Sequence, residues 1–218
     1  MFDSFRENLK KILIECCVET YGEAINAEKK GADQIELCSD LNNDGLTPNF
    51  DLIKKVIHNI SIPVKIMVRP RSGDFNYTDT DMKEIKKQIF HLKSIDINHI
   101  VFGALTKNKL VHIDNVKRVS DWAYPMKITF HKAIDHSINF FKDIEILVES
   151  KRIDGLLTSG KSDSASSGAK IINKVVSSFG KKIKIISAGK ITASNLNNIH
   201  KKIGGSYYHG RKILGKLY

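Results

Sequence analysis

Residues 13–38 read LIECCVETYGEAINAEKKGADQIELC, which is a short apolar run of β type, a longer polar segment, and a second β-type run. The same alternation continues along the whole chain, with strand-type runs beginning near residues 12, 34, 64, 99, 127, 155, 183 and 205. A spacing of roughly 22–35 residues is typical of a strand–helix unit. Eight such units predict one (β/α)₈ TIM-barrel domain over residues 1–218. A doubly wound open sheet is the alternative, but CCVETYGEA lacks its glycine-rich fingerprint.

The segments between the strand-type runs have helical spacing. In residues 78–95, TDTDMKEIKKQIFHLKSI, apolar side chains recur at Met82, Ile85, Ile89 and Leu92, after a cap at Thr78 or Asp79. Only RKILGKLY follows the eighth run, so we expect the final helix to be short or missing. The barrel wall beside the last and first strands would then be thinly covered, and a homodimer could supply the cover.

The composition excludes several classes of protein. No apolar run approaches the roughly 18 residues that a membrane helix needs, and we expect no membrane partner. Three cysteines without a spaced framework fit a reducing compartment, so the cytoplasm is expected. The net charge is +11, but only six of the 35 basic residues are arginines and the lysines are dispersed. This pattern favours a solvated surface and not a nucleic-acid partner.

Polar side chains share faces within the predicted strands. Because side chains alternate along a strand, Glu15 lies on the same face as Cys17, and Glu36 on the same face as Cys38. Lys65, Met67 and Arg69 share one face of the third strand. Inward polar groups usually collect at the carboxyl ends of barrel strands, where they are used. The predicted catalytic set in this cavity is Glu15, Glu36, Arg69, His131 and His209, with a histidine near neutral pKa as the proton carrier.

Several motifs at these positions resemble the CutC family of copper homeostasis proteins. They include GADQIELCSDL at 31–41, IPVKIMVRPRSGDFNYT at 62–78, TFHKAID at 129–135 and HG at 209–210. In the turn at 187–192 this chain has SAGKIT, where the family has a glycine-rich sequence. The resemblance implies a TIM barrel, a cytoplasmic location and a link to Cu(I) handling.

The first hypothesis for the site is a copper(I) centre. Cu(I) is soft and favours thiolates, and two can suffice. Cys17 and Cys38 occupy equivalent positions on adjacent strands, and in the family these two positions are the proposed ligands. Cys16 would face the other way and pack against a helix. The alternative is that both cysteines act as small apolar residues of the core.

The second hypothesis is an enzyme that acts on a small anionic substrate, a phosphate or a carboxylate, at the carboxyl-terminal mouth of the barrel. Arg69 or Arg71 would clamp the anion, with Asp74 orienting an arginine. Turns after the sixth, seventh and eighth strands would add further contacts, as barrels commonly bind phosphate there. These predicted binding residues are Ser159, Gly160, Gly189, Lys190 and Gly210. A third hypothesis is a non-catalytic interaction protein.

Overall fold

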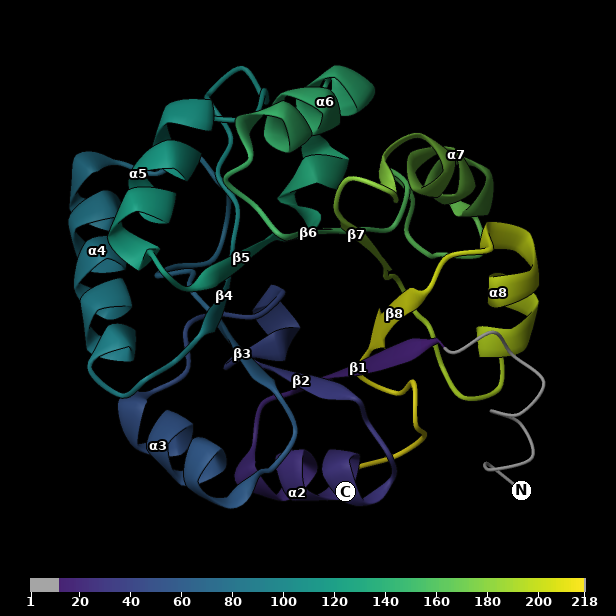
Figure 1. The fold of residues 1–218 in the computed structure, drawn as a ribbon, viewed down its shortest axis with the longest axis horizontal. Coiled ribbons are helices and arrows are strands. Elements are labelled where there is room, and N and C mark those ends of the chain that lie inside the picture. Colours follow the sequence, from purple (N-terminus) through teal and green to yellow (C-terminus); the bar gives the residue numbers. More distant parts are fainter. Residues whose placement is uncertain (1–11, 218) are drawn as a thin grey trace.

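Eight parallel strands close into one barrel in the computed structural model, which describes residues 12–217 (Figure 1). Each strand pairs with the next one in sequence, and β8 pairs with β1. The predicted (β/α)₈ fold is confirmed; residues 1–11 and 218 of the predicted domain lie outside the described residues. The strands are β1 (Leu13–Val18), β2 (Gln34–Leu37), β3 (Val64–Met67), β4 (His99–Phe102), β5 (Lys127–Phe130), β6 (Gly155–Thr158), β7 (Lys184–Ser187) and β8 (Tyr207–Gly210).

Helices form the outer ring around this barrel (Figure 1). Thr78 caps the longest of them with a capping box, and the four predicted apolar positions of that helix are all buried. The helices between the strands are α2 (Tyr21–Lys29), α3 (Phe50–Asn59), α4 (Asp79–Lys93), α5 (Ile113–Ala123), α6 (Phe140–Ser150), α7 (Ala169–Phe179) and α8 (Leu196–Ile203). Short 3₁₀ helices η1 (Leu41–Asn43) and η2 (Lys132–His136) follow β2 and β5.

The strands separate two apolar environments, as their alternation predicts. Cys16 and Val18 belong to the large core between the barrel and the helices, whereas Cys17, Cys38 and Met67 form a small cluster of their own with Val101. A one-residue step along β1 therefore moves a cysteine from the outer face to the interior. The predicted positions of Cys16 and of the other two thiols are confirmed.

The chain after β8 forms turns and no helix as far as residue 217, in agreement with the expected missing final helix. Ile213, Leu214 and Leu217 in this segment are nevertheless buried, and the Asn26 side chain on α2 donates a hydrogen bond to the Leu217 carbonyl at 2.8 Å. The segment runs from β8 past β1 and packs on α2 (Figure 1). The thinly covered wall that motivated a homodimer is thus not seen in the described residues; the dimer stays a prediction.

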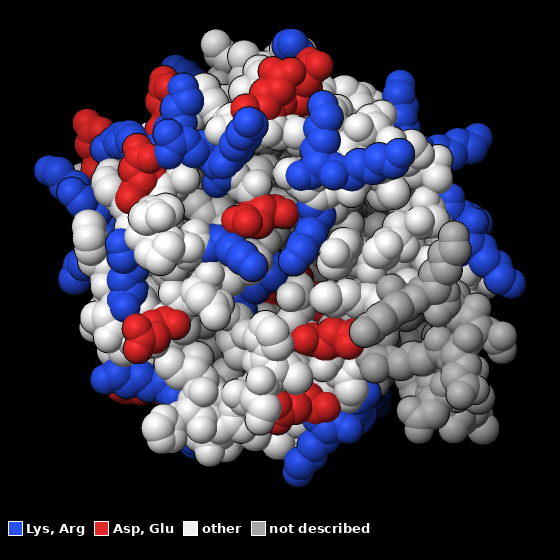
Figure 2. Space-filling model, viewed as in Figure 1, with Lys and Arg blue, Asp and Glu red and all other residues white. Residues whose placement is uncertain are grey.

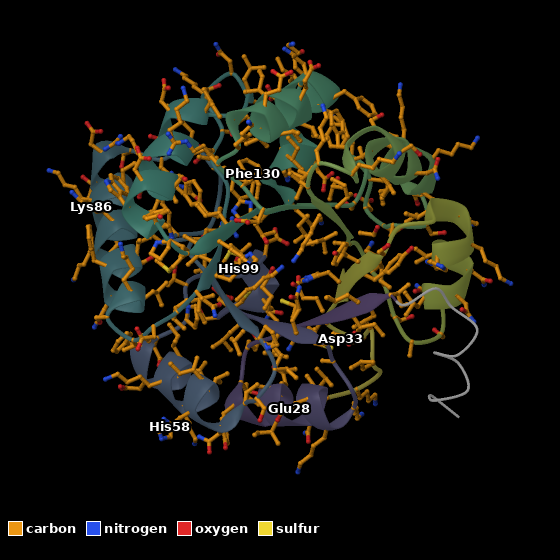
Figure 3. The ribbon with its side chains drawn as sticks, viewed as in Figure 1. Glu28, Asp33, His58, Lys86, His99 and Phe130 are labelled. Atoms are coloured by element: carbon orange, nitrogen blue, oxygen red, sulfur yellow. The ribbon has the colours of Figure 1, made fainter. Side chains whose placement is uncertain are left out.

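The outer surface carries dispersed charge. Figure 2 shows Lys and Arg side chains around the outline of the molecule as well as near its centre, with acidic side chains among them. In Figure 3, His58 and Lys86 lie on the peripheral helices α3 and α4, whereas His99 lies at the barrel wall. Within residues 12–217, no helix combines the length and the apolarity that crossing a membrane requires.

Candidate functional site

A cavity of about 270 Å³ lies at the carboxyl ends of the barrel strands. Carboxyl ends of parallel strands meet at one end of the barrel, so strands distant in sequence contribute to the same wall. Glu15 lies beneath this wall and is fully buried. Nine of the predicted site residues line the cavity: Cys17, Glu36, Cys38, Arg69, His131, Gly189, Lys190, His209 and Gly210.

The two predicted metal ligands form a buried thiol pair. The Sγ atoms of Cys17 and Cys38 are 3.9 Å apart, and both side chains are almost fully buried. The hydrogen bond from Cys38, together with His209, outweighs burial and lowers the pKa of the Cys17 thiol to about 6. The same hydrogen bond raises the pKa of Cys38 well above its usual value. At neutral pH the pair holds one thiolate, on Cys17, and one thiol, on Cys38.

Beneath the thiols, Glu15 joins two cations in a buried ion cluster. Its Oε2 accepts a hydrogen bond from the Gln34 side chain and lies 2.7 Å from the Lys65 Nζ, while Oε1 lies 2.7 Å from His209 Nδ1. Burial alone would raise the pKa of Glu15, but Lys65 and His209 hold it well below its usual range. Burial would likewise lower the pKa of His209, yet Glu36, Cys17 and Glu15 raise it well above 6.5. Glu15 is therefore ionised and His209 is a cation.

Glu36 has the opposite protonation behaviour. Burial raises its pKa to about 8, and the neighbouring Cys17 and Glu15 charges add to the shift. Its Oε1 lies 3.6 Å from the Cys38 Sγ, and Oε2 has no hydrogen-bond partner among the described residues. Near neutral pH this carboxyl group carries its proton, so it is a group whose charge can change inside the cavity.

Arg69 closes another part of the cavity wall, just beyond the end of β3. Its Nη1 donates to the carbonyls of Asn43 (2.8 Å) and Gly45 (3.2 Å), and its Nη2 donates to the Gly73 carbonyl at 3.0 Å. The guanidinium carbon lies 4.9 Å from the centre of the Phe75 ring. Only 3 % of the residue is exposed, and no ion pair with a described residue compensates its charge.

His131 follows β5 and faces the same Phe75 ring, with 5.0 Å between the ring centres. Its Nδ1 accepts the Ala133 N–H at 3.1 Å, which places the ring hydrogen on Nε2. Burial and the nearby Arg69 charge lower its pKa to about 3. Neither His131 nor His209 thus has the near-neutral pKa expected of a proton carrier, because burial dominates one and carboxylates dominate the other.

Four predicted binding residues do not line this cavity. Arg71 extends to Asp74 and Asp81 on the surface, at 3.0 Å from each carboxylate, so Asp74 orients an arginine as expected, but outside the cavity. The Ser159 hydroxyl donates to Asp135 (2.9 Å) or to the Ser162 carbonyl (2.7 Å), and its backbone N–H also donates to Asp135. Gly160 follows it in the same turn. The structure gives these residues roles within loops.

The predicted residues after β7 and β8 do reach the cavity. Gly189 has a φ of +107°, and a Cβ atom there would lie 2.9 Å from the Ser159 Cβ, so this turn requires glycine. A Cβ on Gly210 would lie 2.6 Å from the Ile191 carbonyl oxygen. Lys190 adds a cationic side chain to the wall between these two glycines.

Sequence reasoning missed Lys65 as a member of the site. Besides its contact with Glu15, its Nζ lies 3.3 Å from Thr129 Oγ1, which in turn lies 2.9 Å from His99 Nε2. A polar chain therefore runs from His99 through Thr129 and Lys65 to Glu15. The signal was a lysine inside the apolar run VKIM, on the same strand face as Arg69.

Among residues 12–217, two groups of donor atoms have the proximity that a metal ion needs. Cys17, Glu36 and Cys38 form one group, and Glu15, Glu36 and His209 form the other; in each, the ligand atoms lie within 4.8 Å of one another. The first group offers two sulfur atoms, which suit a soft ion. In the second group, Glu15 is already engaged by Lys65.

Comparison with known sequences gives one consistent result. The model of the CutC family matches residues 12–214. A human protein described as a copper homeostasis protein cutC homolog is 36% identical over 199 residues, which cover 90% of this chain and 72% of the relative. A family protein CutC from Mesorhizobium japonicum is 30% identical and shares 90% of this chain and 76% of its own length.

Solved structures agree with these sequence matches. A CutC structure from Streptococcus agalactiae superposes with a TM-score of 0.87 at 27% identity, covering 93% of this chain and 99% of that one. A phosphoribosyl anthranilate isomerase from Thermococcus kodakaraensis reaches a TM-score of 0.56 at 14% identity, with 91% and 87% covered. This second likeness concerns the barrel fold alone.

Proposed function

The chain belongs to the CutC family, and from this premise we propose that it serves copper homeostasis by binding Cu(I) between Cys17 and Cys38 in the cytoplasm. The observation that carries the proposal is the pair of cavity-lining Sγ atoms at 3.9 Å. All three cysteines are free, which fits a reducing compartment.

The chemistry of the thiol pair suits a soft monovalent ion. A metal binds the thiolate form of cysteine, and Cys17 holds that form at neutral pH. Binding through both sulfur atoms would release the remaining proton of Cys38. The thioether of Met67 lies in the same small cluster and is a further soft group.

A Cu(I) titration tests this proposal. The protein is titrated anaerobically in the presence of a chromophoric Cu(I) chelator that competes for the ion. We expect Cys17→Ala and Cys38→Ala each to weaken Cu(I) binding by at least about tenfold, since each removes one of two sulfur ligands.

Cys16→Ala is the matched control, because Cys16 is a buried thiol adjacent in sequence that faces the helices. It should leave the Cu(I) affinity unchanged. If all three variants bind Cu(I) as the wild type does, the cavity thiols are not the ligands and the proposal is wrong.

An enzyme acting on a small anionic substrate is the second candidate function, and Glu36 is the observation that favours it. Glu36, with a pKa of about 8, lies on the cavity wall, and the ionised Glu15 lies beneath that wall, so two carboxyl groups with different protonation states are neighbours. In this proposal Glu36 exchanges the proton, and the cationic side chain of Lys190 attracts the substrate.

Turnover can be sought with a mixture of small phosphorylated and carboxylated compounds, followed by NMR. If the wild type consumes one compound and Glu36→Gln does not, the result would support an enzyme. Equal consumption by both proteins would remove Glu36 from the chemistry.

A further inference from the structure

The guanidinium group of Arg69 is a buried cation that forms no ion pair with any of residues 12–217. An arginine side chain has five N–H donors and stays charged. The carbonyls of Asn43, Gly45 and Gly73 accept three of them, so Nε–H and one Nη2–H remain; Nε has no acceptor among the described residues. Carbonyl oxygens orient the group but carry no net charge. A buried charge is costly unless it is paired, so the missing component here is an anion.

A second unpartnered donor belongs to another residue of the cavity wall. The Nε2–H of His131 is buried and has no acceptor among the described residues, whereas Nδ1 is occupied by the Ala133 N–H. Gly103 makes room for this ring, because a Cβ atom there would lie 2.5 Å from His131 Nδ1. The ring thus contacts the Ala133 N–H, the Phe75 ring and Gly103, while its Nε2–H has no acceptor among the described residues.

These two groups line one cavity and share one aromatic neighbour, the Phe75 ring. Both offer hydrogen atoms only, so their common ligand has to be an acceptor, and the arginine charge favours a negative one. We propose that Arg69 and His131 form a binding subsite for the oxyanion group of a small molecule, a carboxylate or a phosphate. This subsite would bind the substrate of the second candidate function. The proposal depends on that function for turnover of the ligand, but not for its binding.

The surroundings narrow the size and shape of the ligand. A cavity of about 270 Å³ lies just below the range usual for sites that bind drug-sized molecules. Leu41, Met67 and Leu157 also line it, so a short apolar part of the ligand has surfaces to contact. Lys132 and Lys190 lie on the wall as further cationic groups, and Asp44 lies there as an acidic one. The thiol pair lies on the same cavity, which brings the anion close to Cys17 and Cys38.

Calorimetric titration of the copper-free protein tests the subsite, with sodium acetate and sodium phosphate as the probes and sodium chloride as the ionic background. We expect at least one probe to bind the wild type above the chloride background. Acetate binding alone identifies a carboxylate site, and phosphate binding alone a phosphate site. We expect Arg69→Gln to weaken binding by at least about tenfold, since it removes a charge-assisted contact.

Arg71→Gln is the matched control, because Arg71 is two residues away and already paired with Asp74 and Asp81. It should change the affinity by less than about twofold. His131→Asn keeps an acceptor for the Ala133 N–H but removes the Nε2 donor, and should weaken binding by about fivefold. This variant serves as the test if Arg69→Gln does not fold.

Two results would overturn the subsite: no binding of either probe to the wild type, or equal losses in the Arg71→Gln control. Because Cu(I) binding is measured separately, failure of the anion titration leaves the copper proposal standing, and the reverse also holds.

Discussion

Lys65 in β3 and Arg69, two residues beyond the end of that strand, are two buried cations that differ in their counter-charge. Lys65 contacts the Glu15 carboxylate at 2.7 Å, and His209 contacts the other oxygen of the same group. Arg69 is held by three uncharged carbonyl oxygens. Both side chains are at most 3 % exposed. The compensated cluster holds neighbouring strands together, whereas Arg69 is the cation for which we propose an anionic ligand.

Glu15→Gln should remove the counter-charge of Lys65 and have the largest effect on the free energy of unfolding. The substitution leaves Lys65 buried without its anion, and removing one partner of a buried ion pair costs about 3–5 kcal/mol. Urea unfolding followed by circular dichroism measures this loss.

The double variant Glu15→Gln/Lys65→Met is the control for that experiment. It removes both charges and should recover most of the lost stability, because the cost comes from the unpaired charge. A double variant as unstable as the single one would mean that packing, and not charge, accounts for the effect.

Arg69→Met should cost less, about 1–3 kcal/mol, because it removes a cation that has no partner charge and leaves carbonyl groups without donors. The same urea experiment measures it. A loss as large as that of Glu15→Gln would contradict the comparison, since it would mean that Arg69 is compensated after all. Acetate or phosphate should raise the unfolding midpoint of the wild type and leave that of the variant unchanged.

The alternation of apolar runs was sufficient to predict the barrel. The alternation of side chains within each strand was sufficient to predict that Cys17, Cys38 and Glu15 face the barrel interior. This alternation does not extend beyond the strand ends. If the strand continued, Arg69 and Arg71 would lie on the same face, but β3 ends at Met67. By residue 71 the chain has left the sheet, and the nearby carboxylates Asp74 and Asp81 decide where that side chain lies. Ser159 and Gly160 follow β6 in the same way.

The protonation states of Glu15 and Glu36 could not be predicted from the sequence. Glu15 and Glu36 occupy the similar segments LIECC and QIELC, each two residues before an inward cysteine. Their pKa values nevertheless shift in opposite directions, because Lys65 and His209 contact Glu15 whereas burial dominates Glu36. These partners come from strands far along the chain, so only the closed barrel reveals which carboxyl group is ionised.

Per pH unit, the dependence of stability on pH that comes from His131 is the smallest of the expected effects. Burial and the nearby Arg69 charge lower its pKa from 6.5 to about 3 in the folded protein. Between these pH values the unfolded chain binds a proton that the folded protein does not, so stability falls as the pH falls below about 6.5. The contribution is at most about 1.4 kcal/mol per pH unit.

His131→Asn isolates this contribution, because His99, whose pKa burial also lowers to about 3, is unchanged in the variant. Unfolding free energies measured from pH 6.5 down to pH 4 should therefore fall more steeply for the wild type than for the variant. Parallel curves would mean that His131 takes up a proton without unfolding. A bound oxyanion gives a further test. By neutralising Arg69 it should raise the pKa of His131 and make the unfolding free energy of the wild type depend less on pH.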